Sequence, residues 1–179
     1  DSRDRVRSVF LSGDILYAAV RRIGLVAVDI SNLNRPREVG VLATADTPWD
    51  VWVEGYNAYI AVSSEGLQVI NVSDPEQLEN IGLFTRRGGI PYVEVSGDYA
   101  YILGKGFLRI LDISQPSNPV EIAIYDSIRS VSAFWSEGDY GYLVGGHQFK
   151  VFDISDPTDP VELGEPDTLL YDGDNLVVS

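Results

Sequence analysis

The chain has 179 residues, 45% hydrophobic and 22% charged, a composition typical of a globular domain with a substantial core. Its net charge of −14 makes nucleic acid and anionic lipid headgroups poor partners, so neither is expected. Cysteine is absent, which excludes disulfides, thiol catalysis and cysteine-based zinc sites. No stretch approaches the roughly 18 apolar residues of a membrane span, so none is expected.

The first part of the chain predicts four short β-strands. Residues 9–12 are rich in apolar side chains and lead into Gly13, which with the aspartate after it is typical of a hairpin turn. A second strand is centred on Tyr17, a third covers residues 25–30, and a fourth covers residues 38–42. None of these segments shows the apolar period of a helix, so helices are expected to be scarce.

The same pattern recurs about every 42 residues along the chain. An Asp-Ile-Ser triplet, or a close variant of it, begins at Asp29, Asn71, Asp112 and Asp153. The glycine before the second strand keeps the same period, at Gly13, Gly55, Gly97 and Gly138. Two markers that share one period over four copies indicate that one supersecondary unit is stacked against copies of itself.

Four antiparallel strands in about 42 residues match the size of one β-propeller blade, so the prediction is an all-β propeller in a single domain, residues 1–179. The expected blades cover residues 6–44, 45–85, 86–125 and 126–164, with a partial fifth blade at 165–179. Closed propellers usually have at least four full blades, more often five to eight, and the fifth copy here is cut short, so we favour an incomplete piece of a larger ring. The alternatives are completion by another copy of the chain, or a small closed ring with an irregular last blade.

The third strand of each repeat indicates how the sheets pack. Residues 25–30 are apolar on both faces, as expected for a sheet that lies between two neighbours. Polar side chains enter this strand at one register, where we expect them to reach a gap between blades: Gln68, Arg109 and Lys150. The acids of the Asp-Ile-Ser triplets could suggest a metal site. Asn71 keeps the acceptor oxygen without the charge, however, so we interpret these residues as turn-forming and predict no metal.

These residues together resemble the LVIVD repeat. Residues 25–29 and 108–112 correspond to its name-giving strand, and residues 93–101 are close to its other signature. The resemblance covers about residues 6–164, although the second repeat has Leu78 where a second proline usually stands. It implies a β-propeller of the kind found in exported or surface proteins of bacteria and archaea. It implies no catalytic residues, because the family has no common active-site motif.

The loops predict where a partner would bind. The turns after the first and third strands are nearly the same in every repeat, and we expect them on one face of the propeller. The loops after the second strands and the connections between blades differ from repeat to repeat, and we expect them on the opposite face. Because variable loops carry specificity, we expect the partner on the variable face, around the central funnel. Trp49 and Asp50 suit a stacking and carboxylate contact, and arginine pairs suit an anionic group. Packing of Trp49 between blades, with solvated arginines, is the alternative. The candidate residues are Arg21, Arg22, Asp46, Trp49, Asp50, Arg86, Arg87, Asp126 and Arg129.

The sequence favours a non-catalytic binding or scaffolding module of an exported or cell-surface protein, although this chain carries no signal peptide. Its expected partner is another protein or a surface polymer, and no cofactor is predicted. His147 is the single histidine, so no Ser-His-Asp set can form. The competing class is a hydrolase with catalytic carboxylates in the funnel, and the candidate carboxylates are Asp46, Asp50 and Asp126. Two carboxyl groups with raised pKa values in one pocket would favour this class. A third class is an assembly subunit that self-associates through open blade edges.

Overall fold

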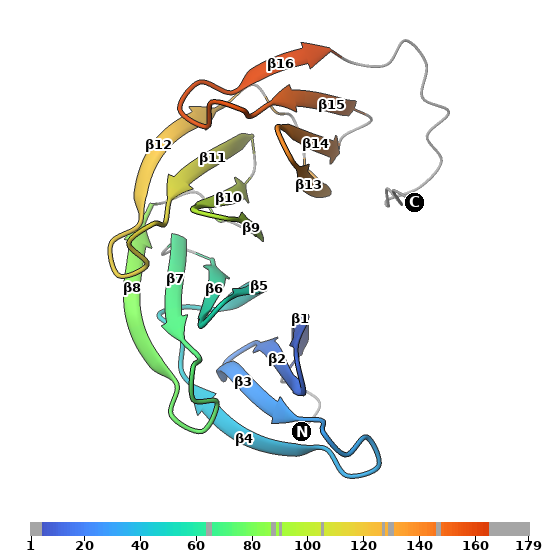
Figure 1. Cartoon of the computed structure of the whole chain (residues 1–179), viewed down its shortest axis with the longest axis vertical. Helices are drawn as coiled ribbons and strands as arrows, with labels where there is room; N and C mark the ends of the chain where they lie inside the picture. The colour runs from blue at the N-terminus through green and yellow to red at the C-terminus, as the bar shows by residue number, and fades with distance from the viewer. Residues whose placement is uncertain are drawn as a thin grey trace.

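A computed structural model of the chain describes residues 5–63, 66–86, 89, 91–104, 106–126, 128, 131–145 and 148–164. The regular elements of these residues are all β-strands, and they form four antiparallel four-stranded sheets. The sheets follow one another along an open arc (Figure 1). The predicted all-β repeat of four-stranded blades is therefore confirmed. The predicted partial fifth blade lies outside the described residues. In the part of the chain that the structure describes, no helix is long and apolar enough to cross a membrane.

Each sheet runs from an inner strand to an outer one in chain order (Figure 1). The first sheet contains β1 (Val6–Ser12), β2 (Ile15–Val20), β3 (Gly24–Asp29) and β4 (Arg37–Leu42). The second contains β5 (Pro48–Glu54), β6 (Asn57–Val62), β7 (Gly66–Asn71) and β8 (Glu79–Thr85). The third contains β9 (Tyr92–Ser96), β10 (Tyr99–Gly104), β11 (Phe107–Asp112) and β12 (Val120–Tyr125). The fourth contains β13 (Ala133–Glu137), β14 (Tyr140–Gly145), β15 (Gln148–Asp153) and β16 (Val161–Gly164).

A glycine in the left-handed region closes each inner hairpin. Its φ is 58° at Gly13, 57° at Gly55, 58° at Gly97 and 57° at Gly138. Glycine reaches this conformation without the clash that a β-carbon would introduce, and the resulting tight turn matches the twist of the two strands. The periodic glycines of the sequence therefore mark the ends of the inner strands.

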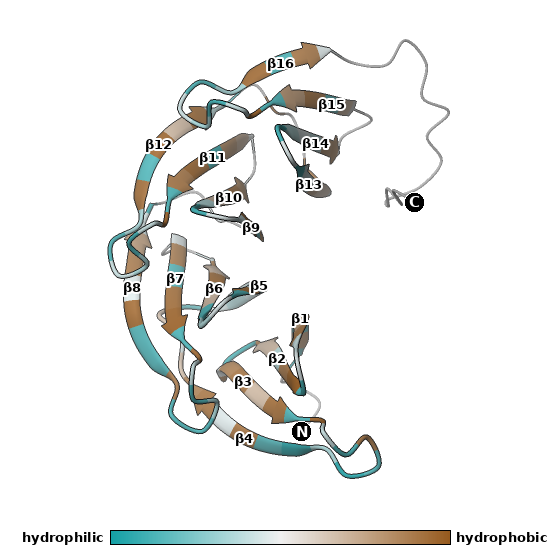
Figure 2. Cartoon of the chain, in the orientation of Figure 1, coloured by the Kyte–Doolittle hydropathy of each residue, from teal (hydrophilic) through white to brown (hydrophobic). Residues whose placement is uncertain are grey.

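The hydrophobic core is divided into seams between consecutive sheets. Each of the three seams joins one face of a sheet to the opposite face of the next, and a fourth, small cluster lies within the first sheet. The tyrosines at the same register of the first three sheets, Tyr17, Tyr59 and Tyr101, are buried in successive seams. Figure 2 shows hydrophobic residues along the strands and hydrophilic ones in the turns between the third and fourth strands. Both faces of an interior sheet are thus apolar. Residues 25–30 show the same pattern, but they lie in the first sheet, where the described residues place a neighbouring sheet on one face only.

The polar side chains of the third strands are paired within the seams. Gln68 donates to Asn80 Oδ1 at 3.1 Å and accepts from the N–H of Ala45 at 2.9 Å. Lys150 Nζ lies 2.7 Å from Glu162 Oε1, and Glu162 also accepts a hydrogen bond from the Tyr125 hydroxyl of the preceding sheet. These pairs satisfy polar groups that would otherwise be costly to bury.

The Asp-Ile-Ser triplets form Asx turns, as interpreted from the sequence. The first side chain of each triplet accepts a hydrogen bond from the backbone N–H two residues later, at 2.8–3.0 Å for Asp29, Asn71, Asp112 and Asp153. Hydrogen bonds from Ser31 hold the pKa of Asp29 below its ordinary value, with the Arg37 guanidinium as a smaller cause. The carboxylates are therefore committed to the turns.

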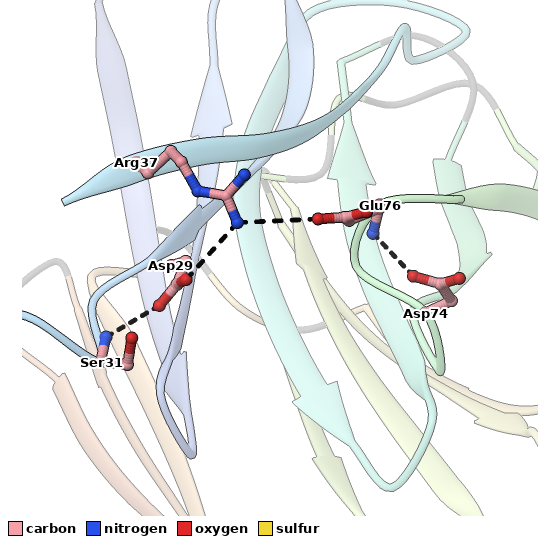
Figure 3. A network of polar contacts seen from close by, with 5 residues as sticks. All are labelled: Asp29, Ser31, Arg37, Asp74 and Glu76. Atoms are coloured by element: carbon pink, nitrogen blue, oxygen red, sulfur yellow. Dashed lines mark hydrogen bonds and ion pairs between the residues drawn. The ribbon is translucent and has the colours of Figure 1, made fainter.

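Arg37 joins the first two sheets at this exposed edge. Its guanidinium lies 3.7 Å from Asp29 and 3.6 Å from Glu76 of the next sheet (Figure 3). Because exposed ion pairs contribute little to stability, we expect Arg37→Ala to change the free energy of unfolding by about 0.5 kcal/mol or less. Urea denaturation of the variant and the parent chain tests this expectation. A loss above about 2 kcal/mol would show that the pair holds the seam together.

Candidate binding site on the inner side of the arc

Backbone hydrogen bonds place the two sets of loops at opposite ends of the inner strands. At one end, the repetitive turns are joined to each other, as Ile30 N–H donates to Asp14 C=O at 2.8 Å. The same bond recurs in the other three sheets. At the other end, the variable loop after β6 meets the connection into β5, as Ser63 N–H donates to Thr47 C=O at 3.0 Å. We call these the turn end and the connection end.

A hollow of about 280 Å³ lies where the four inner strands meet, and we call it the inner hollow. The inner hollow lies near the connection end, because its lining includes Tyr92, the first residue of β9, and Ser132, which directly precedes β13. Aromatic rings and two carboxyl groups stand out in its wall: Asp50, Trp52, Tyr92, Glu94, Phe134 and Trp135. A mostly apolar wall with a few polar groups is the usual composition of a small-molecule or side-chain binding site.

Asp50 ties the second inner strand to the third. Its carboxylate accepts hydrogen bonds from Val51 N–H at 2.9 Å and from Val93 N–H at 3.1 Å, and from the Ser8 hydroxyl. Burial raises the pKa of Asp50, against the lowering effect of these bonds. The residue that the sequence offers for a ligand contact is therefore also a link between neighbouring sheets.

Glu94 ties the third inner strand to the fourth in a similar way. Its Oε1 atom accepts from Ser136 N–H at 2.6 Å and from the Ser136 hydroxyl at 2.5 Å. Burial raises the pKa of Glu94 to about 7. Sequence reasoning missed this residue, although a signal exists: Glu94 occupies the register that holds Phe10, Trp52 and Trp135 in the other repeats.

Two polar atoms of the inner hollow's wall have no hydrogen-bond partner among the described residues. They are Oε2 of Glu94 and Nε1 of Trp52, and both are buried. A buried polar group without a partner is costly, so such groups are commonly satisfied by water or by a ligand. The wall of the inner hollow thus contains one buried acceptor and one buried donor without partners, beside aromatic side chains.

Trp49 and Asp50 are adjacent in β5 but do not face one site together. Asp50 lines the inner hollow, whereas Trp49 Nε1 donates to the Ser63 hydroxyl of the loop after β6. The Arg7 guanidinium lies 4.0 Å from the Trp49 ring centroid, a cation–π contact between the first and second sheets. Trp49 remains exposed at the connection end.

Arg22 and Asp46 come together at the connection end. They line a second hollow of about 230 Å³ beside Thr44 and Thr47. Arg22 has a φ of 69°, which is uncommon for a residue with a β-carbon. Arg21 is held through its backbone, as its N–H donates to Arg5 C=O at 2.9 Å. This hollow therefore combines charges of both signs.

The remaining candidates are spread along the arc. Arg86 lies 3.8 Å from Glu121, which also pairs with Arg109 within the third sheet. Asp126 is exposed just after β12. Arg87 and Arg129 lie outside the described residues. The structure therefore does not gather the candidate arginines into one anion site with Trp49.

Comparisons with known proteins agree with this architecture. Among solved structures, the fold is similar to the computationally designed Ika4 protein, with a TM-score of 0.70 at 10% identity over 83% of this chain and 91% of that one. It is also similar to the designed Ika8 protein, with a TM-score of 0.64 at 10% identity over 77% of this chain and 42% of that one. A search of curated proteins finds no matching sequence.

The family model that matches is that of the LVIVD repeat. It matches four times, at residues 5–44, 47–84, 89–127 and 128–168, and so covers most of the chain. Each match covers one of the four sheets, apart from Thr85 at the end of β8. The chain therefore belongs to the LVIVD-repeat family.

Proposed function

We propose that the chain is a non-catalytic binding module of an exported or cell-surface protein, with a partner protein or surface polymer at the connection end. The observation that carries the proposal is the inner hollow, where aromatic rings surround an unpartnered acceptor on Glu94 and an unpartnered donor on Trp52. The loops at this end differ from repeat to repeat, while the turn end repeats. A rigid scaffold that presents variable segments beside a hollow is a common way to build a binding site.

Binding at the connection end predicts that substitutions there matter more than substitutions at the turn end. Purified soluble cell-wall polysaccharides serve as the first probe, measured by biolayer interferometry. Tyr92 lines the inner hollow and is 37% exposed, so Tyr92→Ala should weaken binding at least about tenfold, which corresponds to the loss of roughly 1.4 kcal/mol. Tyr56→Ala is the matched control, because Tyr56 is an exposed aromatic residue at the turn end. Equal losses in the two variants would contradict the proposal.

A protein partner is tested with a photo-crosslinking residue at position 49 and, as the control, at position 56. Surface-protein extracts should give a specific product from position 49 alone. The exported location rests on the family resemblance. Antibody labelling of intact source cells tests it, and labelling only after lysis would contradict it.

A carboxylate hydrolase is the second candidate, because Asp50 and Glu94 both line the inner hollow and burial raises both pKa values. The hydrogen bonds favour the binding role instead. Both Asp50 oxygens and Glu94 Oε1 bind neighbouring groups of the scaffold, so one carboxyl oxygen, Glu94 Oε2, is left for chemistry. Release of reducing ends from the same polysaccharides, abolished by Glu94→Gln, would overturn the non-catalytic proposal.

A further inference from the structure

The first sheet has an apolar face that points away from the second sheet, and we call it the leading face. It carries Val9 and Leu11, which are 52% and 57% exposed. The residues at the register of Val9 in the next two sheets, Val51 and Val93, are 2% and 3% exposed. These inner-strand positions are therefore open in the first sheet, although Ala18, Val20 and Val26 on the same face are 6–7% exposed and form a small buried cluster of their own.

The fourth sheet has the complementary open face, which points away from the third sheet, and we call it the trailing face. Trp135 is 47% exposed and Leu163 is 55% exposed. Tyr142, Phe149 and Val151 are only partly buried, whereas the residues at their registers in the first three sheets are fully packed. In the part of the chain that the structure describes, no sheet follows the trailing face, which is thus one half of a seam.

The three internal seams show what each open face fits. In the first seam, the Tyr17 hydroxyl donates to the Val72 carbonyl of the next sheet at 3.3 Å. In the third, the Tyr101 ring packs against Phe134 of the next sheet, with ring centroids 5.2 Å apart. The corresponding residues at the open faces are Tyr142 on the trailing face and Ile30 and Val9 on the leading face. The leading and trailing faces are therefore the two halves of a seam that the molecule already forms three times.

We propose that the trailing face of one chain packs on the leading face of a second copy, and that two copies close one eight-sheet ring. In the arc, both open faces lie on its open side (Figure 1). A two-fold rotation of a second arc then pairs both ends at once, so the association closes instead of growing into a filament. Closure would also cover Trp135 and complete the wall of the inner hollow.

The mass of the full chain in solution tests the proposal. Sedimentation equilibrium at micromolar concentration should give twice the 19.7 kDa of one chain. Because each copy carries a net charge of −14, raising the salt concentration should strengthen the association. A monomeric mass would overturn the proposal, also where residues of the same chain cover the trailing face. A series of larger and larger masses would overturn it as well.

Charge substitutions on the two faces make the test specific. Leu11→Arg on the leading face and Leu163→Arg on the trailing face should each raise the dimer dissociation constant about 100-fold or more, because a buried seam would then hold an unpaired charge. Leu33→Arg is the matched control, since Leu33 is 80% exposed in the turn between β3 and β4.

Mixing the two face variants separates this head-to-tail pairing from any other. The Leu11→Arg chain keeps its trailing face and the Leu163→Arg chain keeps its leading face, so one unaltered seam can form between them. The mixture should therefore contain pairs that neither variant forms alone. Association of either variant at the parent's strength, or a mixture that stays monomeric, would overturn the proposal. Circular dichroism confirms that each variant is folded.

Discussion

Replacing Gly82 with alanine is expected to lower the free energy of unfolding by about 3 kcal/mol, the upper end of the usual range for overpacking. Gly82 lies in the outer strand β8, where a β-carbon would be 2.3 Å from the Pro116 carbonyl oxygen of the next sheet. The contact is with backbone, so the seam itself must open. Gly40 repeats the arrangement one sheet earlier, with 2.0 Å to the Pro75 carbonyl oxygen. Calorimetry should show a midpoint lower by roughly 10 °C.

Gly55→Ala is the control for this prediction. Gly55 has a φ of 57° and no atom within 4 Å of an added β-carbon, so alanine there meets conformational strain alone. That strain costs about 1–2 kcal/mol. If the two variants lost equal stability, close approach of the sheets at Gly82 would not be the cause.

We expect Glu94 to make a contribution to the free energy of unfolding that decreases as the pH rises. Burial raises the pKa of Glu94 from 4.5 to about 7 in the folded state. The folded chain therefore holds this proton after the unfolded chain has lost it. The resulting stabilisation is fully present below pH 4.5 and is lost as the pH rises through 7. The expected difference is roughly 3 kcal/mol, in the sense of a lower free energy of unfolding at high pH.

Glu94→Gln isolates this contribution. Glutamine keeps an acceptor for the Ser136 bonds and does not titrate. The turn aspartates act in the opposite sense, because hydrogen bonds from Ser31, Ser114 and Ser155 lower the pKa values of their partners. Urea denaturation from pH 4 to 8 should therefore give parent and variant curves that diverge between about pH 4.5 and 7 and run parallel above that range. Curves that are parallel over the whole range would show that Glu94 has an ordinary pKa.

The periodic parts of the fold were predictable because every repeat faces the same physical problem. Gly13 and its counterparts must adopt a left-handed conformation, and Asp29 and its counterparts must accept a backbone hydrogen bond, so both leave a signal every 42 or so residues. The two-sided apolar pattern of the third strands indicated face-to-face packing for the same reason. These signals are local, and four copies reinforce them.

The candidate site was less predictable because its contacts join different repeats. The sequence suggests a ligand contact for Asp50, yet its oxygens bind Val51 and Val93, and only the register of neighbouring inner strands reveals this. Glu94 breaks the repeat by replacing an aromatic residue, so a comparison of registers could have identified it. The contact of Arg7 with Trp49 depends on the approach of two sheets, which no single repeat specifies.

The four repeats are sheets packed in seams, tied together on the inner side by Asp50 and Glu94, with the variable loops gathered at one end. A crystal structure of the full chain at neutral pH tests this arrangement most directly. It should show the Asp50 carboxylate on the Val93 N–H, the Glu94 carboxyl on Ser136, and Ser63 beside Thr47 at the connection end. Inner strands without these two links, or variable loops at both ends, would contradict it.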